Sequence, residues 1–373
     1  MLKNLQTIRS NDHEISPNAT SDGVIASQRP RASASTKLRI LLWSNAFHPS
    51  IGGLEAVSSM LAMEFVRQGH FVTVVTRTAS AEKDKFPFVV FRRPGRLQMF
   101  RLVKKCDVYF QNHISLKVAW PLLLVRRPWV VAHHTWIPRS GMSGIMKHFM
   151  LRYARSISCS AEIAAHLKLP SVVICSPYDD SVFREQSEAR RERDLIFVGR
   201  LSKEKGINLL FDALGLLKSQ GQVPTLTIIG GGPEQNDLAR QAQEFGLAGQ
   251  VDFVGSKAPA AVADLLSRHR ILVVPSVYRE PFGIVALEGI ACGCVVVGSE
   301  GGGLKDAIGP CGVTFPNGDA SALADRLSEL LKKPEMWRIY KRGAAAHLQS
   351  FTRAAVADSY LKMLRTAYES AST

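Results

Sequence analysis

The fold is decided by Leu38–Thr76, LRILLWSNAFHPSIGGLEAVSSMLAMEFVRQGHFVTVVT. Its first residues form an apolar run, which is typical of a buried parallel strand. A loop with Gly52 and Gly53 follows, and the apolar residues of Leu54–Arg67 then recur at helical spacing. The apolar segment Phe71–Thr76 is the next predicted strand. Strand, glycine loop, helix and strand predict a βαβ unit, and hence a parallel sheet that presents ligand contacts at the carboxyl ends of its strands.

The same alternation continues along the whole chain. In the first half the further predicted strands are Phe88–Phe91, Val108–Gln111, Trp129–Ala132, Ile157–Ser160 and Val172–Cys175. In the second half they are Leu195–Val198, Thr225–Ile229, Val251–Val254, Ile271–Val274 and Val295–Val297. Helical stretches lie between them, so the pattern predicts an α/β fold of two doubly wound, Rossmann-like domains.

The length of 373 residues is too great for one ordinary core and suits two domains. Residues 1–36 have no periodic apolar pattern and are predicted to form a mobile tail. Ser181–Arg193 carries seven charges in thirteen residues and is the predicted linker. The domains are then expected at 37–180 and 194–345, with a final segment at 346–373.

Composition narrows the class of protein. Apolar residues make up 46% and charged residues 21%, as in ordinary globular proteins. The six cysteines show no CxxC pair and no histidine spacing suited to zinc, which favours a reduced, cytoplasmic setting. No apolar run reaches the roughly 18 residues that a membrane-spanning helix needs, and no secretory signal is recognisable.

The net charge of +15 is unevenly distributed. Residues 37–180 contain 20 Lys or Arg against 8 Asp or Glu, a net of +12, whereas residues 194–341 contain 15 against 16. The positive electrostatic field of the first half would attract acidic membrane surfaces and nucleic acids. Alternatively, the charge only keeps the protein soluble. The basic residues form no stripe interleaved with aromatics and no known module pattern, which disfavours nucleic acid as a partner.

The stretch Ser276–Ile308, SVYREPFGIVALEGIACGCVVVGSEGGGLKDAI, combines acidic residues with a glycine turn. Glu280 and Glu288 stand eight residues apart, and a predicted strand then runs into Gly301–Gly303 and a new helix. A strand, a glycine turn and a helix start form an anion site, because free amides and the helix dipole face the ligand. Carboxylates beside an anion site suit a ligand with both phosphates and hydroxyls, such as a nucleotide sugar.

A second candidate lies in GRLSKEKG, Gly199–Gly206, after a predicted strand. Arg200 and Lys205 would suit a pyrophosphate. The guanidinium of Arg200 can donate two parallel hydrogen bonds to phosphate oxygens, and the ammonium of Lys205 acts as a point charge. The alternative is a solvated basic loop. The sequence contains no Asp-x-Asp, so we expect no metal, and the charge of a leaving diphosphate would be neutralised by cations and amides.

Two further motifs leave alternatives open. Gly230 opens a Gly-Gly-Gly-Pro turn after a strand, but Gln235 stands where a dinucleotide fingerprint needs its third glycine, which disfavours a hydride-transferring enzyme. His133 and His134 follow the strand Trp129–Ala132 at the edge where ligands bind. Such a pair is either functional or merely structural.

Together and in this order, the motifs resemble those of retaining glycosyltransferases of the GT-B fold, family 4. The resemblance runs from about Lys37 to Ile308 and weakens toward Leu331. Asp306 stands where the family more often has Glu. The matching parts are Gly-Gly-x-Glu at Gly52–Glu55, Gly-Arg-Leu-x-x-x-Lys-Gly at Gly199–Gly206, Glu-x7-Glu from Glu280 to Glu288, and the turn Gly301–Gly303.

The resemblance implies a role for each matching residue. Arg200 and Lys205 would hold the donor diphosphate, Glu280 would read the hydroxyls of the donor sugar, and Glu288 would accept hydrogen bonds from the ribose. His134 best matches the active-site histidine of the family, with His133 as the unresolved rival. The other implied donor contacts are Gly52, Gly53, Gly230, Val254, Phe282, Gly283, Gly302, Gly303 and Leu304.

The implied activity is transfer of a hexose, with retention, from a UDP- or GDP-hexose to a glycan or lipid-linked acceptor in cell-surface or exopolysaccharide synthesis. No cofactor is implied. The predicted helix Thr352–Ser370 would return to the first domain, and the two domains would face each other across a cleft. The rival hypotheses are a basic nucleic-acid-binding protein and an epimerase or phosphorylase of the same fold.

Many members of this family act at the cytoplasmic face of the membrane. Binding to an anionic membrane surface would explain the positive charge of residues 37–180. Met142–Arg155 combines apolar residues with Lys147, Arg152 and Arg155, as an interfacial helix does. An ordinary helix packed on the sheet is the alternative. We therefore expect a cytoplasmic protein that associates peripherally with the inner face of the plasma membrane.

Overall fold

The computed structural model describes residues 37–50, 52–80, 84–186 and 191–372. The predicted tail at residues 1–36 and part of the predicted linker lie outside this range. Residues 37–373 form one compact unit. The predicted domain limits remain predictions.

The first half of the chain forms a seven-stranded sheet in which every neighbouring pair is parallel. The strand order is β3-β2-β1-β4-β5-β6-β7, so the chain starts in the middle and winds outward in both directions. The strands are β1 (Arg39–Ser44), β2 (Phe71–Thr76), β3 (Val89–Arg92), β4 (Val108–Asn112), β5 (Trp129–His133), β6 (Arg155–Ser158) and β7 (Ser171–Val173).

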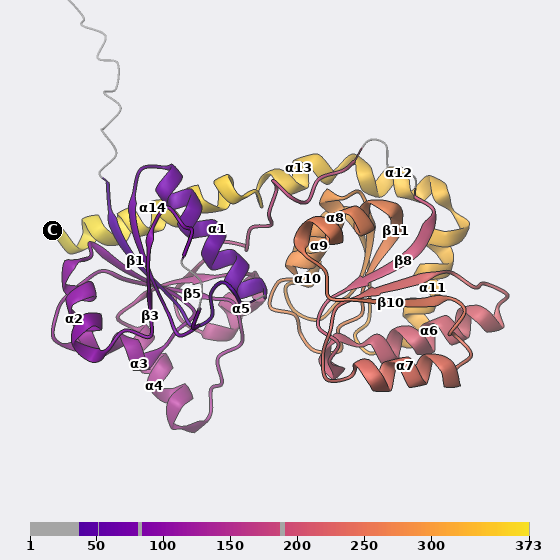
Figure 1. Cartoon of the computed structure of the whole chain (residues 1–373), viewed down its shortest axis with the longest axis horizontal. Coiled ribbons are helices and arrows are strands. Elements are labelled where there is room, and N and C mark those ends of the chain that lie inside the picture. The colour runs from indigo at the N-terminus through magenta and orange to yellow at the C-terminus, as the bar shows by residue number, and fades with distance from the viewer. Residues whose placement is uncertain (1–36, 51, 81–83, 187–190, 373) are drawn as a thin grey trace, which may run out of the picture. The chain divides into compact units, whose positions relative to one another are not determined.

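Helices cover both faces of this sheet (Figure 1). Along β1 the apolar side chains alternate, because Ile40 and Leu42 pack in one core cluster and Leu41 and Trp43 in another. A strand that is apolar on both sides needs this double cover. The helices of this half are α1 (Gly53–Arg67), α2 (Arg96–Lys105), α3 (Leu116–Ala119), the 3-10 turn η1 (Trp120–Leu123), α4 (Gly141–Leu151) and α5 (Ala161–Leu167).

The second half repeats the plan with a six-stranded parallel sheet of order β10-β9-β8-β11-β12-β13. Its strands are β8 (Arg193–Val198), β9 (Leu226–Ile229), β10 (Val251–Gly255), β11 (His269–Val274), β12 (Val295–Ser299) and β13 (Gly312–Phe315). Its helices are α6 (Ile207–Ser219), α7 (Gln235–Glu244), α8 (Pro259–Arg268), α9 (Ile284–Ala291), α10 (Leu304–Ile308), α11 (Ala320–Lys332), α12 (Pro334–Arg342) and α13 (Ala344–Gln349), with 3-10 turns η2 (Lys203–Lys205) and η3 (Gly309–Cys311).

The last helix, α14 (Arg353–Ser372), packs against the first sheet rather than the second. Its buried residues Val356, Tyr360 and Leu364 share a core cluster with Leu42 of β1 and Phe65 of α1. Figure 1 shows α14 running along the part of the molecule that contains β1 and α1.

Several boundaries differ from those expected. α4 ends at Leu151, so Arg152 caps it and Arg155 opens β6, and the interfacial helix expected over Met142–Arg155 is shorter than predicted. β13 and α12 were not predicted. The first has only four residues, and the second is a nine-residue helix in which no side chain is fully buried, so both are short elements.

Candidate active site

The loops that follow β8, β9 and β11 of the second sheet, together with the end of β10, are hydrogen-bonded side by side. Gly230 after β9 donates its amide to Gly255 of β10 at 3.0 Å, and Leu201 after β8 donates to Gly231 at 3.1 Å. Val277 after β11 donates to Glu204 at 3.0 Å. These loops therefore form one continuous rim at the carboxyl edge of the sheet, where an open α/β sheet binds its ligands.

The centre of this rim is the pair of Lys205 and Glu280. The Lys205 ammonium lies 2.6 Å from Oε1 of Glu280, although 75 residues separate the two in sequence. Ser276 donates its hydroxyl to the same oxygen at 2.6 Å, and Tyr278 donates to Oε2 at 2.9 Å. The Lys205 ammonium also lies 5.3 Å from the centre of the Tyr278 ring. The carboxylate is buried and held from three directions.

Burial and the neighbouring Glu280 carboxylate raise the pKa of Tyr278 far above its ordinary value. The phenol therefore stays protonated and keeps donating its hydrogen bond at every physiological pH. Neither Ser276 nor Tyr278 was singled out in the sequence, although both lie within four residues of Glu280. Their contribution depends on how the loop folds back, which no spacing rule reveals.

Backbone geometry fixes where Lys205 and the glycine turn lie. Gly206 has φ +70°, and a Cβ there would come within 2.0 Å of the carbonyl oxygen of Pro275. Gly302 has φ +84°, and its Cβ would come within 2.0 Å of the carbonyl oxygen of Glu280. Only glycine fits such positions. The glycines thus bring the loops after β8, β11 and β12 into direct backbone contact.

The predicted anion turn is built as a short bridge between Glu280 and Gly302. The Glu280 amide donates to Gly301 at 3.1 Å, and the Gly303 amide donates back to Glu280 at 2.8 Å. Among the described residues, the amides of Gly302 and Leu304 donate to no other backbone group, and both residues are buried.

Two of the predicted donor contacts have buried side chains. Phe282 and Leu304 both belong to the apolar core, and a Cβ on Gly283 would meet Leu304 at 2.5 Å. These residues can therefore face a ligand only through their backbone. Val254 is also packed against this core, whereas Arg200 is exposed on the loop after β8.

Glu288 lies in α9, half-buried, and among the described residues its carboxylate has no hydrogen-bond partner. Burial, with a smaller contribution from Asp179, raises the pKa of Glu288 to about 7. No donor within the described part of the protein offsets the desolvation of the Glu288 carboxylate. It can therefore accept hydrogen bonds from a ligand.

The raised pKa of Glu288 predicts a measurable stability effect. The folded state holds the proton more tightly than the unfolded state, so this group contributes stability below its ordinary pKa of 4.5 that is lost as the pH rises through about 7. Glu288→Gln is therefore expected to raise the free energy of unfolding by on the order of 2 kcal/mol at about pH 8 and to change it little near pH 5. Urea unfolding at both pH values measures the difference, and equal effects at the two would contradict the assignment.

The two candidate histidines differ in burial and in their contacts. His133 is fully buried and lies 3.1 Å from the hydroxyl of Ser156 through its Nε2. His134 is half-buried, and its Nε2 lies 2.7 Å from Oδ1 of Asn112 and its Nδ1 3.3 Å from the Ser176 hydroxyl. Of the two, only His134 has surface that a ligand could reach. Its role as the active-site histidine remains a prediction.

Both histidines are neutral at physiological pH, because burial lowers the pKa of each to about 3. Since the carbonyl oxygen of Asn112 only accepts, the neutral ring of His134 carries its proton on Nε2. Asn112 is oriented in turn by donating its amide to Ser58 at 2.6 Å. This chain of contacts ties the end of β5 to α1.

The first half of the chain reaches the rim at two glycines. A Cβ on Gly53, the first residue of α1, would lie 3.8 Å from the side chain of Ile284, which follows Gly283. A Cβ on Gly303 would lie 2.6 Å from Cβ of Ser160. Gly52 lies beside Gly53, where a Cβ would come 2.5 Å from the Glu55 carboxylate. Gly52 and Gly53 are thus brought next to the loop that contains Glu280.

A further contact between the halves was not predicted. Trp136 donates its indole N–H to the carbonyl of Arg279 at 2.8 Å, and the Arg279 guanidinium lies 4.7 Å from the centre of its ring. Arg279 also pairs with Glu162 of α5. Because Arg279 directly precedes Glu280, this contact fixes one end of the loop that holds the buried carboxylate.

Within the described part of the chain, no group of three or more His, Cys, Asp or Glu residues is arranged to hold a metal ion. The groups at the rim that can meet an anion are the ammonium of Lys205, the guanidinium of Arg200 and the amides of the glycine turn.

Comparison with known proteins finds a family match in the second half of the chain. Residues 179–347 match the family described as Glycosyl transferases group 1. The glycogen synthase of Mycobacterium tuberculosis is 38% identical over 168 residues, which cover 43% of this chain and 40% of that protein. The D-inositol 3-phosphate glycosyltransferase of Gordonia bronchialis is 30% identical over 192 residues, covering 48% and 42%. The chain thus spans about two fifths of the length of the curated relatives it matches.

Solved structures resemble nearly the whole chain. Sucrose-phosphate synthase from Thermosynechococcus elongatus superimposes with a TM-score of 0.76 at 23% identity and covers 90% of this chain and 100% of that one. Anabaena HepE in complex with UDP and glucose gives a TM-score of 0.75 at 20% identity, covering 88% and 99%. These likenesses confirm the expected GT-B fold of two doubly wound domains. The residues that hold the Lys205–Glu280 pair lie in the segment that matches the group 1 glycosyl transferases.

Proposed function

We propose that the protein is a retaining glycosyltransferase that moves a hexose from a UDP- or GDP-hexose to a glycan or lipid-linked acceptor in polysaccharide synthesis. The observation that carries this proposal is the ion pair of Lys205 with the buried Glu280, beside the bridge between Glu280 and Gly302. One cation, one fixed carboxylate and backbone amides suit a ligand that carries phosphates and hydroxyls together. The match of residues 179–347 to group 1 glycosyl transferases supports the reaction class.

In the proposed complex the donor diphosphate lies against Lys205, Arg200 and the amides of Gly302 and Leu304. The Lys205 ammonium has three N–H donors and uses one on Glu280, so the others are free for phosphate oxygens. The Glu280 carboxylate would accept hydrogen bonds from hydroxyls of the donor sugar. The unpartnered Glu288 carboxylate would accept hydrogen bonds from the ribose hydroxyls. Gly52 and Gly53, from the first half of the chain, would approach the donor phosphates from the opposite side. Gly230 and Val254 would lie next to the base of the nucleotide.

In the proposed reaction the bond from the anomeric carbon to the diphosphate breaks, and a bond to the acceptor oxygen forms on the same face of the sugar. The acceptor proton passes to the leaving phosphate oxygen. The protein contributes positioning and charge stabilisation as negative charge grows on the diphosphate. The neutral His134, with its proton fixed on Nε2, would orient the sugar rather than carry a proton. No cofactor or bound metal takes part in the proposed step.

The reaction class is tested by incubating the protein with UDP- and GDP-hexoses and following nucleoside diphosphate release. Nuclear magnetic resonance of the anomeric proton in the first-formed product then reports the stereochemistry. We expect release with one nucleotide class and an unchanged anomeric configuration. An inverted product would contradict the retaining mechanism, and no release with any sugar nucleotide and a panel of glycan and lipid acceptors would contradict the function.

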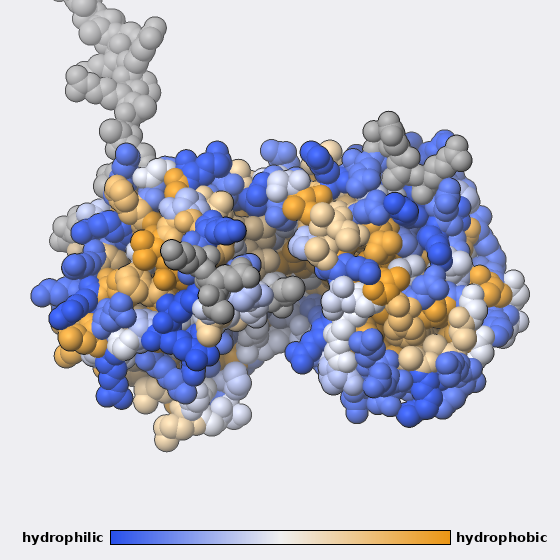
Figure 2. Space-filling view, viewed as in Figure 1, coloured by the Kyte–Doolittle hydropathy of each residue, from blue (hydrophilic) through white to orange (hydrophobic). Residues whose placement is uncertain are grey.

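We further propose that the acceptor is met at an anionic membrane surface, through α4. Four apolar residues of this helix are exposed, with fractions of 45% to 78%: Met142, Ile145, Met146 and Phe149. Lys147 lies on the same helix, and Arg152 follows directly. Figure 2 shows an apolar, pale orange region over α4. An apolar face bordered by cations, on the half of the chain with a net charge of +12, suits an anionic interface. No helix in the described residues is long and apolar enough to cross a bilayer.

The α4 surface makes a specific prediction for vesicle binding. The double variant Ile145→Ser/Phe149→Ser is expected to bind vesicles that contain anionic lipid at least tenfold more weakly, because each buried side chain contributes about 1.5–3 kcal/mol. Leu97→Ser is the control, because Leu97 is equally exposed but lies on α2. Co-sedimentation at low salt measures binding. Wild-type protein that stays in the supernatant, or equal loss in the control, would remove the proposal.

A further inference from the structure

A basic pocket lies at the opposite edge of the second sheet from the candidate active site. Its lining includes Arg191, two residues before β8, Arg270 in β11, and Val295 at the start of β12. All three mark the amino ends of parallel strands, whereas Lys205 and Glu280 follow the carboxyl ends. The six-residue strands β8 and β11 put roughly 20 Å between the two edges. No motif in the sequence pointed to this pocket.

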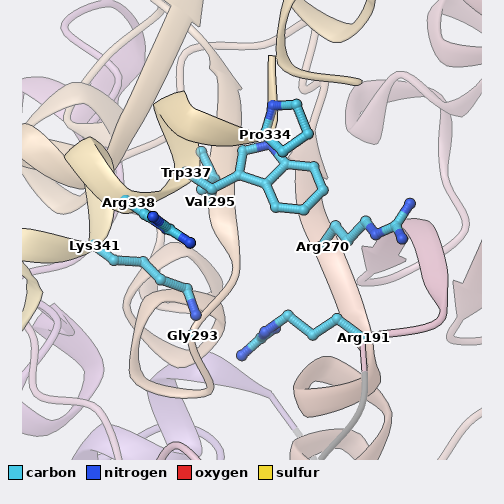
Figure 3. A pocket seen from close by; sticks show the side chains of 8 residues that line it. All are labelled: Arg191, Arg270, Gly293, Val295, Pro334, Trp337, Arg338 and Lys341. Carbon is cyan, nitrogen blue, oxygen red and sulfur yellow. The ribbon is translucent and has the colours of Figure 1, made fainter. Parts of the chain in front are cut away.

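The pocket has a volume of about 260 Å³ and is lined by eight residues, of which four are cations and none is acidic. Figure 3 shows the side chains that line it, with the indole of Trp337 among the basic groups. The lining residues are Arg191, Arg270, Gly293, Val295, Pro334, Trp337, Arg338 and Lys341.

Two carboxylates outside the lining balance only part of this charge. Glu185 pairs with both Lys341 at 2.9 Å and Arg191 at 3.4 Å, and Asp194 pairs with Arg270 at 2.8 Å. Among the described residues, Arg338 has no ion-pair partner. Within the described residues, four cations against two carboxylates leave two positive charges at the pocket, which matches a dianion.

Two of the four cations, Arg191 and Arg270, are held in place before any ligand arrives. The Arg191 guanidinium donates to the backbone carbonyls of His269 and Cys292, and the adjacent Gly293 has φ +83°. A Cβ on Gly293 would come within 2.2 Å of Nη2 of Arg191, so glycine leaves the space that the guanidinium fills. Nε of Arg270 is buried without a hydrogen-bond partner. Such groups lose little freedom on binding an anion, which favours affinity.

The remaining wall is aromatic and rigid. Trp337 donates its indole N–H to the carbonyl of Leu330 at 2.9 Å, and the Arg270 guanidinium lies 5.3 Å from the centre of its ring. An indole fixed in this way offers an apolar surface to the body of a ligand whose charged end meets the guanidinium and ammonium groups.

We propose that this pocket is a second binding site, for a small molecule that carries a phosphate monoester. The guanidinium groups of Arg191 and Arg338 and the ammonium of Lys341 bind the dianionic phosphate, and Trp337 contacts the sugar or base attached to it. The volume suits one such group rather than a whole nucleotide sugar. The site does not depend on the proposed transfer reaction, because none of its residues belongs to the candidate active site.

The experiment is titration calorimetry on the full chain with inorganic phosphate, a hexose 6-phosphate and a nucleoside 5′-monophosphate, at millimolar concentrations and constant ionic strength. At least one of them is expected to bind with a one-to-one stoichiometry. Arg338→Ala should weaken that binding about tenfold or more, since it removes a charged hydrogen-bond donor. Arg342→Ala is the matched control, because Arg342 is exposed on the same helix but does not line the pocket.

The comparison of variants decides between the possible sites. Lys205→Ala should leave the binding unchanged, which distinguishes the pocket from the proposed donor site. Tighter binding of an ester than of inorganic phosphate would show that the indole contributes, and equal binding would show that the phosphate alone is recognised. No binding by any of the three, equal weakening in Arg338→Ala and Arg342→Ala, or loss of binding in Lys205→Ala would each overturn the proposal.

Discussion

Lys205→Ala is expected to lower turnover by on the order of 10²–10³, the cost of removing one well-placed charge-stabilising group. The Lys205 ammonium is the cation of the rim that pairs with the buried Glu280, and no other cation lies within hydrogen-bond distance of Glu280 among the described residues. Without it, the growing charge on the leaving diphosphate has only the exposed Arg200 and the amides to stabilise it.

The fold should survive this substitution. Glu280 would keep the hydrogen bonds from Ser276 and Tyr278, so the carboxylate is not left without donors. Lys203→Ala is the matched control, because Lys203 lies in the same 3-10 turn but is exposed. Turnover measured with the active donor, together with the melting temperature, separates the two effects. Near-normal turnover in Lys205→Ala would contradict the assignment.

Glu280→Gln is expected to lower kcat/KM by on the order of 10², because hydrogen bonds to a charged group contribute about 1.5–3 kcal/mol and more than one is lost. The carboxylate accepts from Lys205, Ser276 and Tyr278 with two oxygens. An amide has a single acceptor oxygen, and its NH₂ group would face one of these donors. Glu300→Gln is the control, since Glu300 is an exposed carboxylate beside the same glycine turn.

The losses of activity caused by Lys205→Ala and Glu280→Gln should not be additive in free energy. Lys205 and Glu280 are in direct contact, and residues in contact share their interaction free energy. We expect Lys205→Ala/Glu280→Gln to be little worse than the poorer of the single variants. If the two losses multiply, the residues act independently and the pair is not the functional unit.

The fold could be predicted from the sequence because its signals are local. The apolar run at β1 and the helical spacing in α1 each require only neighbouring residues, and the alternation of such segments indicates a doubly wound sheet. Boundaries were predicted less well, as at α4, where the helical spacing of the sequence continues into Arg152 although the helix ends at Leu151 and the chain turns toward β6. Short elements such as the four-residue β13 and the nine-residue α12 were not predicted.

The candidate site could be predicted only residue by residue. The motifs named Lys205 and Glu280 separately, but their ion pair depends on loops that are 75 residues apart. The choice between His133 and His134 depends on which ring turns inward at the end of β5, which the sequence leaves open. The basic pocket has no motif, since its lining residues come from four separate segments of the chain.

Titration calorimetry of UDP-, GDP- and ADP-hexoses measures donor binding at the rim that contains Lys205 and Glu280, and it needs no knowledge of the acceptor. We expect at least one class to bind the wild-type protein and the Lys203→Ala control alike, and to bind Lys205→Ala at least tenfold more weakly. Binding that is equally tight in Lys205→Ala, or no binding of any sugar nucleotide to the wild-type protein, would contradict this expectation.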